Sequence, residues 1–289
     1  MTSREEWLAG ARPKTLAAGI APVIVGTAFA GYNANAFNFF LALVVGVGLQ
    51  VGVNYANDYS DGIKGSDSDR VGPVRLVGSG AATPEAVKRA ALIAISIAAL
   101  AGLLLSARSS WILLALGALS IIAAWTYTGG PKPYGYQAMG EVSVFIFFGV
   151  VATVGTYYVQ TESVSREVIL ASFAMGALAC AILVLNNLRD LPSDEVAGKK
   201  TLAVVIGDKS TRDLYKWLMF FALVISVALA LFSFYYLFAL VSLPLVSKSV
   251  RAVSAGARGG ELISLLAKTG RIQIIYSIAL SFAAWLVAR

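Results

Sequence analysis

The feature that most constrains this chain is a series of apolar runs, many of them about 18 residues or longer, that recurs along its whole length. A run of that length, wound into a helix, crosses the hydrocarbon core of a bilayer. The composition agrees, because 58% of the 289 residues are hydrophobic and only 13% are charged. Soluble domains are closer to roughly a quarter charged. The sequence therefore predicts an all-α, polytopic membrane protein.

The apolar runs between polar breaks predict nine transmembrane helices in a single domain, 1–289, with weakly related halves of about 1–130 and 131–289. The expected spans are 15–31, 37–57, 86–106, 111–128, 138–160, 167–188, 213–231, 233–247 and 272–288. The break between the seventh and eighth spans is the weakest, since residues 217–247 are nearly continuous apart from the region of Ser233.

The basic residues support this count. If the N-terminus is cytoplasmic, 20 of the 23 Lys and Arg residues face the cytoplasm, and only Arg108, Arg166 and Arg289 lie outside. The expectation is a multi-pass protein of the cytoplasmic membrane with its C-terminus outside. The net charge of +7 then reflects topology and attraction to anionic membrane lipid, and no nucleic-acid-binding motif is present. The oligomeric state stays open.

The aspartates are confined to two places. All eight lie between Asp58 and Asp69 or between Asp190 and Asp213, after the second and sixth expected spans and on the predicted cytoplasmic side. We expect these segments, roughly 58–85 and 189–212, to be long loops. One explanation is that Asp, Asn, Gly and Ser simply form solvated turns there. The recurrence of acids at two matching helix ends favours a binding site instead.

The spacing of these acids suggests metal binding. Asp58 and Asp61 are three residues apart, and Asp190 and Asp194 are four apart, so on a helix each pair shares one face. Two like charges held there repel each other unless a cation lies between them. The chain has no histidine, and hard oxygen donors suit Mg²⁺, Mn²⁺ or Ca²⁺. We predict two Mg²⁺ ions, replaceable by Mn²⁺, between these carboxylates and a diphosphate, with Asp67 as a further candidate ligand.

Basic and amide side chains accompany both acidic clusters, where a bound anion would need them. The candidates for diphosphate binding are Asn54, Asn57, Lys64, Arg70, Arg75, Lys132, Arg189, Lys199 and Lys200. For Lys132, in the loop GGPKPYGY, placement by the positive-inside rule is the alternative explanation.

The two acidic stretches resemble sequence motifs of a known family. NDYSD at 57–61 matches the opening of the NDxxDxxxD motif of the UbiA-type intramembrane prenyltransferase superfamily, and DLPSD at 190–194 matches its DxxxD motif. The third acid of the first motif differs, because position 65 is glycine and the next aspartate is Asp67. The resemblance spans nearly the whole chain. It is closest to the branch that prenylates 1,4-dihydroxy-2-naphthoate (MenA), through ARPKTLAAGIAPVIVGTA, NYANDYSDGIKGSD, GEVSVFIFFGVVATVGTYYVQT and NNLRDLPSDEVAGKKTLAV.

The resemblance implies a nine-helix bundle whose central cavity opens to the lipid and is capped by the two acid-rich loops. It implies an isoprenyl diphosphate as donor, an aromatic acid as acceptor and a demethylmenaquinone as product. The candidate pocket residues are Arg12, Tyr127, Tyr134, Glu141, Tyr157 and Asn187. Membrane-interface placement also explains the tyrosines, a favourable helix dipole explains Glu141, and topology explains Arg12.

Three rival functions share some of these features. A sibling enzyme would keep the acidic cap and prenylate another acceptor, such as 4-hydroxybenzoate, homogentisate or a glycerol-phosphate lipid. A cation-coupled transporter also uses acids and repeated halves, but it places ionisable residues near the bilayer midplane. A non-catalytic membrane scaffold would keep the fold without turnover.

Overall fold

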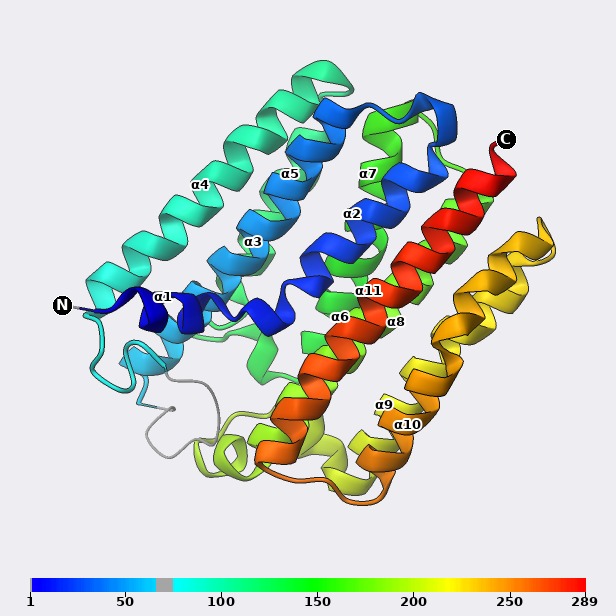
Figure 1. The fold of residues 1–289 in the computed structure, drawn as a ribbon. Helices are drawn as coiled ribbons and strands as arrows, with labels where there is room; N and C mark the ends of the chain where they lie inside the picture. The colour runs from blue at the N-terminus through cyan, green and yellow to red at the C-terminus, as the bar shows by residue number, and fades with distance from the viewer. Residues whose placement is uncertain (1, 66–74) are drawn as a thin grey trace.

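The computed structural model describes residues 2–65 and 75–289, and it is all-α over these ranges apart from one isolated bridge between Gln137 and Lys200 (Figure 1). The first half contains α1 (Arg4–Ala11), η1 (Pro13–Thr15), α2 (Ala17–Phe29), η2 (Gly31–Asn33), α3 (Ala36–Ile63), α4 (Pro84–Arg108) and α5 (Ile112–Thr126). The second half contains η3 (Tyr134–Tyr136), α6 (Gly140–Val144), the π-helix η4 (Phe145–Val151), α7 (Ala152–Thr161), α8 (Arg166–Val196), α9 (Leu202–Leu229), η5 (Phe234–Ser242), α10 (Leu243–Ser254) and α11 (Gly260–Val287).

Each of the nine expected spans overlaps a helical segment, with α6, η4 and α7 forming the fifth and η5 with α10 the eighth. In the described part of the chain, six segments are long and apolar enough to cross a membrane: Ala36–Ile63, Pro84–Arg108, Gly140–Thr161, Arg166–Val196, Phe234–Ser254 and Gly260–Val287. The apolar helices α2 and α5 are shorter. The weak break at Ser233 is confirmed, because α9 ends at Leu229 and η5 begins after Ser233.

Polar residues at the helix starts explain where several spans begin. The Asn35 side chain accepts hydrogen bonds from two backbone amides of the first turn of α3. Thr83, Ser165 and Thr201 each accept one from the first turn of α4, α8 and α9. Such caps satisfy backbone donors that have no partner within the helix. They mark helix starts that an apolar run alone locates only loosely.

The acidic segments are more helical than expected. The expected loops 58–85 and 189–212 contain the last turns of α3, up to Ile63, and of α8, up to Val196. The helix α9 begins at Leu202, well before the apolar run, but its helical geometry is interrupted at Gly207 (φ 79°, ψ 170°). Hydropathy reports the part of a helix that matches the bilayer, and intrahelical hydrogen bonds continue past that limit. The acids therefore lie on helix ends, where their relative directions are defined.

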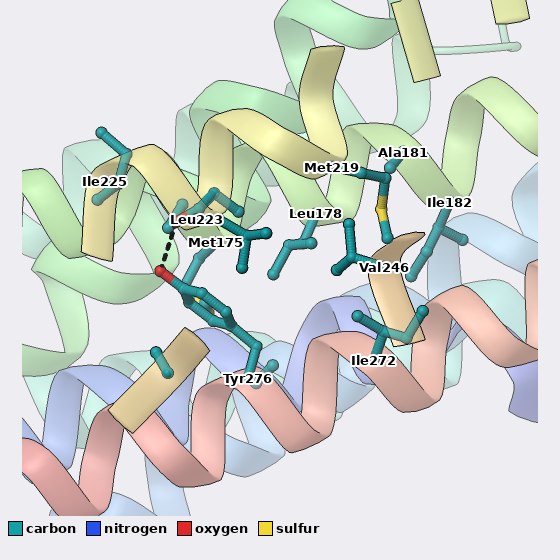
Figure 2. Packing of buried hydrophobic residues seen from close by; sticks show 14 of the residues in the cluster. Met175, Leu178, Ala181, Ile182, Met219, Leu223, Ile225, Val246, Ile272 and Tyr276 are labelled. Carbon is teal, nitrogen blue, oxygen red and sulfur yellow. Dashed lines mark hydrogen bonds between the residues drawn. The ribbon is translucent and has the colours of Figure 1, made fainter. Parts of the chain in front are cut away.

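The helices lie side by side as a bundle in which α8 is central. It packs against α9, α11, η4 and α2, while α3 packs mainly against α4 (Figure 1). Figure 2 shows the main core, where side chains such as Leu178 of α8, Met219 of α9 and Ile272 of α11 interdigitate. The Tyr276 hydroxyl donates to Ala222 O at 2.8 Å, so its polar atom is satisfied inside this apolar contact. This packing fixes the direction of α8 and of the acids at its end.

Glycine permits one contact that positions the cavity wall. An ideal Cβ on Gly149, in the π-helix, would lie 2.4 Å from the Cα of Gly176 in α8. Real Cβ atoms do not approach backbone so closely, so η4 and α8 meet only because neither residue has a side chain. The wall built by the α6–α7 segment therefore depends on this pair.

Gly149→Ala is expected to lower the thermal unfolding midpoint by about 5 °C, because the added methyl group forces η4 away from α8. Thermal unfolding in detergent micelles checks this. Gly155→Ala is the matched control, since a Cβ there meets nothing within 4 Å, and its midpoint should stay close to that of the unchanged protein. Equal midpoints for both variants would contradict the close contact.

Candidate active site

A cavity of about 300 Å³ lies among α2, α3, α5, the α6–α7 segment and α8. Asp61, Asp194 and Lys199 line one end, and mainly apolar side chains and glycines line the remainder. The wall provided by α3 runs from Asp61 to Ala42, which corresponds to about 28 Å at the usual helical rise. A charged end joined to a long apolar body suits an amphiphile with an anionic head and a long tail.

The first acidic pair lies at the end of α3, where both carboxylates are almost completely buried. Asp58 accepts hydrogen bonds from the backbone amides of Leu76 at 2.8 Å and Val77 at 3.0 Å. Asp61 faces the cavity and accepts a short hydrogen bond from the Tyr136 hydroxyl. Asp58 thus holds the backbone at Leu76 and Val77, while Asp61 presents its charge to the cavity.

The second pair lies on the last turns of α8. Arg189 binds both oxygens of Asp190, at 2.8 Å through Nε and at 2.6 Å through Nη2. Asp194 lines the cavity, and its backbone oxygen accepts a hydrogen bond from Lys199 N at 2.8 Å. Pro192, between the two acids, has no amide hydrogen to donate to the preceding turn. The pair therefore also divides into one acid held by a neighbour and one that faces the cavity.

Lys199 joins the two helix ends. Its Nζ lies 3.1 Å from Asp61 Oδ2 and 3.9 Å from Asp194 Oδ1, so these oxygens are within about 7 Å of each other. Arg75 Nη2 lies 3.7 Å from the same oxygen of Asp61. Carboxylates from α3 and α8, separated by more than 130 residues in the sequence, thus face one another across buried cations. The sequence predicted that the two pairs face each other, and the structure brings one acid of each pair, Asp61 and Asp194, to the same end of the cavity.

The carboxylates suit a hard divalent cation by their chemistry. Four buried aspartates supply only oxygen donors, and two of them face the same cavity end. Within 2–65 and 75–289, no group of three or more His, Cys, Asp or Glu side chains is close enough to hold a metal ion without help. Mg²⁺ usually takes one or two carboxylates and completes its shell with water and substrate phosphate. The arrangement therefore fits ions held jointly by protein and diphosphate.

Three of the predicted cations, Lys64, Lys132 and Lys200, do not line the cavity. Lys64 donates to the backbone oxygen of Thr128 at 2.7 Å, and burial lowers the pKa of this amine while the Asp61 carboxylate acts in the opposite direction. Lys132 and Lys200 are exposed on connecting segments. Proximity in sequence does not define side-chain direction, and here the exposed turn points both lysines outward. Arg70 and Asp67 lie outside the described residues.

Two of the predicted amides fix the polar end of the cavity. Asn54 Nδ2 donates to Ala11 O at 2.9 Å, which ties α3 to the N-terminal segment. Asn57 Oδ1 accepts a hydrogen bond from Thr128 Oγ1 at 2.8 Å, which ties α3 to the end of α5. Both asparagines line the cavity. Their hydrogen bonds give them a positioning role beside any contact with an anion.

The predicted tyrosines separate into two groups. Tyr127 and Tyr134 line the cavity, with ring centroids 5.5 Å apart in an edge arrangement. The Tyr134 hydroxyl donates to Ala123 O at 2.8 Å, and burial raises the pKa of this phenol against a smaller effect of its hydrogen bond to Ser143. Tyr157 is not among the cavity-lining residues, because its part of α7 packs on α2.

Arg12 lies where the main cavity meets a second one of about 210 Å³. The two cavities share Arg12, Thr15, Arg75 and Asn186, and Arg189 lines the second. Arg12 adopts a left-handed backbone conformation with φ of 54°, between α1 and η1. Its Nη2 atom is buried and has no hydrogen-bond partner within the described part of the chain. A buried guanidinium nitrogen without a partner indicates a place for an anionic group.

Glu141 and Asn187 form a buried pair beside the cavity. Asn187 Nδ2 donates to Glu141 Oε1 at 2.9 Å, which connects α8 with α6. Glu141 Oε2 is buried without a partner among the described residues, and Asn187 lines the cavity. The first turn of a helix favours an acid here, as expected, but the link to Asn187 is a further reason for it.

Sequence reasoning missed Tyr136. This residue lies in the same short loop as Lys132, and it lines the cavity, hydrogen-bonds Asp61 and lies under Lys199, whose Nζ is 5.1 Å from the ring centroid. From the loop GGPKPYGY, only Lys132 and Tyr134 were predicted to belong to the site. A tyrosine in a polar loop on the same side as both acidic clusters was the available signal.

Comparison with known proteins extends these observations. The model of the UbiA prenyltransferase family matches residues 19–256. The 1,4-dihydroxy-2-naphthoate octaprenyltransferase of Mycobacterium tuberculosis is 48% identical over 285 residues, which cover 98% of each chain. The Escherichia coli protein of the same name is 41% identical over 261 residues, 86% of this chain and 85% of the other.

Solved structures show the same fold. The apo structure of a UbiA homolog from Aeropyrum pernix superposes with a TM-score of 0.74 at 15% identity, covering 93% of this chain and 98% of that one. A UbiA homolog from Archaeoglobus fulgidus, bound to DMAPP and Mg²⁺, superposes with a TM-score of 0.67 at 14% identity, covering 98% and 99%. Together with the acidic helix ends, these matches establish that the chain belongs to the UbiA prenyltransferase family.

Proposed function

We propose that this protein transfers a polyprenyl group from an isoprenyl diphosphate to 1,4-dihydroxy-2-naphthoate, with loss of the carboxylate as carbon dioxide, to give the hydroquinone form of a demethylmenaquinone. The observation that carries the reaction class is the meeting of Asp61 and Asp194 across Lys199 at the charged end of an apolar cavity. The acceptor is inferred from the near full-length similarity to relatives that carry this substrate in their names.

Asp61 and Asp194, which line the cavity, would hold Mg²⁺ together with the diphosphate, with Asp67 as a further candidate. Asp58 and Asp190, the other two predicted ligands, would add negative charge behind them while bound to backbone amides and to Arg189. When bound, Mg²⁺ neutralises charge on the departing diphosphate and so assists cleavage of the allylic C–O bond. Lys199, Arg75 and Arg189 already lie against these carboxylates and are placed to pair with phosphate oxygens. The cation-rich end would thus balance the charge of both the carboxylates and the bound anion.

The apolar wall would protect the allylic carbocation from water. Val53, Phe147 and Leu183 are among the side chains that line the cavity beyond its charged end. The rings of Tyr127 and Tyr134 lie between the two regions, where an aromatic face can stabilise a nearby cation. The prenyl tail would occupy the apolar length, so that only the head group reaches the acids.

We infer that Arg12 binds the carboxylate of the aromatic acceptor. Its buried, unpartnered Nη2 lies at the wall shared by both cavities, close to the cation-lined end. The C–O bond to diphosphate breaks first and its electron pair leaves with the diphosphate; the ring carbon that bears the carboxylate then forms a C–C bond to the allylic cation, and the carboxylate leaves as carbon dioxide. The electron pair of the lost C–C bond restores the aromatic ring.

We also propose that nine segments span the cytoplasmic membrane, with the N-terminus and the acidic end in the cytoplasm and the C-terminus outside. The distribution of 20 of 23 basic residues on that side supports this orientation. The acids of α3 and α8 lie at helix ends, which disfavours a transporter with its ionisable site at the midplane.

The acceptor is tested by incubating purified protein with Mg²⁺, geranylgeranyl diphosphate and, in turn, 1,4-dihydroxy-2-naphthoate, 4-hydroxybenzoate and homogentisate. We expect at least a hundredfold preference for the naphthoate and a product whose mass shows that carbon dioxide has been lost. Mass spectrometry of the extracted product measures both. Prenylation of another acceptor at an equal or higher rate would contradict the proposed substrate, and absence of any product would contradict the enzyme.

A further inference from the structure

Asn187 presents one polar atom to the cavity. Its Nδ2 is engaged by Glu141 Oε1 at 2.9 Å, whereas no described residue hydrogen-bonds its Oδ1. Asn187 lines the cavity, and its Oδ1 is not among the fully enclosed atoms that lack a partner. A carboxamide oxygen that faces the cavity can accept a hydrogen bond and cannot donate one.

Glu141 determines which end of that amide faces inward. A carboxylate only accepts hydrogen bonds, so the NH₂ group of Asn187 must turn toward it and the oxygen must turn away. The glutamate side chain is buried within a segment long and apolar enough to span a membrane, and its second oxygen has no described partner. An ionisable group in such a place is costly and usually serves a function.

Tyr127 supplies a donor at the same part of the wall. It lines the cavity, and an ideal Cβ on Gly140, the residue before Glu141, would lie 3.0 Å from its hydroxyl oxygen. Its own hydroxyl has no hydrogen-bond partner among the described residues. A ring hydroxyl of the aromatic acceptor could donate a hydrogen bond to Asn187 Oδ1 and accept one from the Tyr127 hydroxyl. An ether oxygen in its place could only accept.

We propose that Glu141 is a positioning residue that holds Asn187 with its carbonyl oxygen toward the cavity, where it accepts a hydrogen bond from a ring hydroxyl of the aromatic acceptor. This inference rests on the proposed function and adds the subsite for the hydroxyl group. A hydroxyl that donates a hydrogen bond becomes a better electron donor to its ring, so the contact both orients and activates the acceptor. It also selects against acceptors in which that hydroxyl is blocked.

The test compares Glu141→Met with Glu141→Gln. Glutamine keeps an acceptor oxygen for Asn187, and methionine keeps only the approximate size. We expect methionine to raise the KM for 1,4-dihydroxy-2-naphthoate about tenfold, with the KM for geranylgeranyl diphosphate unchanged, and glutamine to stay within about threefold of the unchanged protein. Equal, large losses of kcat in both variants would overturn the proposal, because they would require the carboxylate itself. An unchanged acceptor KM in Glu141→Met would also overturn it.

The selectivity between the naphthoate and its methoxy ethers provides a second readout. It would not change if Asn187 only packed against its neighbours. The 1-methoxy and 4-methoxy ethers of the naphthoate are each offered to the unchanged protein and to Asn187→Leu. We expect the unchanged protein to discriminate against one of the ethers by about a hundredfold, and Asn187→Leu to lose most of that discrimination. Similar turnover of both ethers and the parent compound by the unchanged protein would overturn the subsite.

Two controls separate this inference from the proposed function and from misfolding. The unchanged protein must first prenylate 1,4-dihydroxy-2-naphthoate, since failure there contradicts the function before any variant is made. Unaltered geranylgeranyl diphosphate affinity in each variant then shows that the charged end is intact. With both conditions met, the acceptor KM and the ether selectivity report only on the hydroxyl subsite.

Discussion

Asp61→Asn is expected to lower kcat/KM by about a thousandfold or more while the protein still inserts in the membrane. The Asp61 side chain is only about 5% exposed, faces the cavity and lies within 3.7 Å of both Lys199 Nζ and Arg75 Nη2. Asparagine has nearly the same size, so it removes the negative charge and an oxygen ligand without opening space. In the proposed mechanism, the Asp61 carboxylate helps to hold the metal–diphosphate complex. Initial-rate measurements with both substrates give the change in kcat/KM.

Asp213→Asn is the matched control, because this aspartate lies on α9 and is exposed. It should retain nearly full activity. Loss of Asp61 leaves two buried cations with less compensation, so thermal unfolding must be measured alongside the rates. A folded Asp61→Asn variant that turns over substrate within tenfold of the unchanged protein would exclude Asp61 from the metal site.

Removal of divalent cations with EDTA is expected to abolish turnover, with a loss of about a thousandfold or more, and added Mg²⁺ or Mn²⁺ should restore it. Without the ions, the diphosphate would face the carboxylates of Asp61 and Asp194, with two further buried aspartates behind them and only the neighbouring cations to offset the charge. Lys199, Arg75 and Arg189 offset part of this charge but are shared with the acids. Product formation in EDTA-treated protein, with and without each metal, measures the effect.

Activity that persists without bound metal would contradict this expectation. Sustained prenyl transfer in excess EDTA, after the bound metal content has been measured and found negligible, would contradict metal-assisted cleavage. Full activity with Ca²⁺ alone would also count against the account, since Ca²⁺ prefers more ligands at longer distances than the small set of carboxylates supplies.

Much of the fold could be predicted because hydrophobic length is a direct physical requirement of a bilayer. Each expected span overlaps a helix, including the weak break at Ser233. The polar ends could not be predicted in the same way. The helix α8 extends to Val196 because its hydrogen bonds are intrahelical whether or not lipid surrounds it, and a short helical segment from Leu202 is separated from the rest of α9 by the non-helical residue Gly207. The division into related halves stays a prediction.

The candidate site was predictable where a physical conflict exposed it. Two carboxylates on one helix face repel, so the pairs Asp58/Asp61 and Asp190/Asp194 predicted a metal site, which stays a prediction. The structure brings one acid of each pair, Asp61 and Asp194, to either side of Lys199. Side-chain direction was not predictable for exposed loops, which is why Lys132 and Lys200 turn away from the cavity.

The register of the fifth span was a separate difficulty. The π-helix Phe145–Val151 rotates all later residues relative to an α-helical register, and Tyr157 follows it. No apolar pattern in the sequence signals such a change. The same helix allows neighbouring Phe147 and Phe148 both to line the cavity. Local backbone geometry therefore decided which aromatic rings reach the substrate region.

The most direct test of the central claim is a calorimetric titration of geranylgeranyl diphosphate, with and without Mg²⁺, into the unchanged protein, Asp61→Asn, Asp194→Asn and Asp213→Asn. If α3 and α8 jointly hold one metal–diphosphate complex, Mg²⁺ should raise affinity by about tenfold or more in the unchanged protein and in Asp213→Asn. Each of the other two variants should lose that gain. A full Mg²⁺-dependent gain in either Asp61→Asn or Asp194→Asn would show that the two helix ends do not share the ligand.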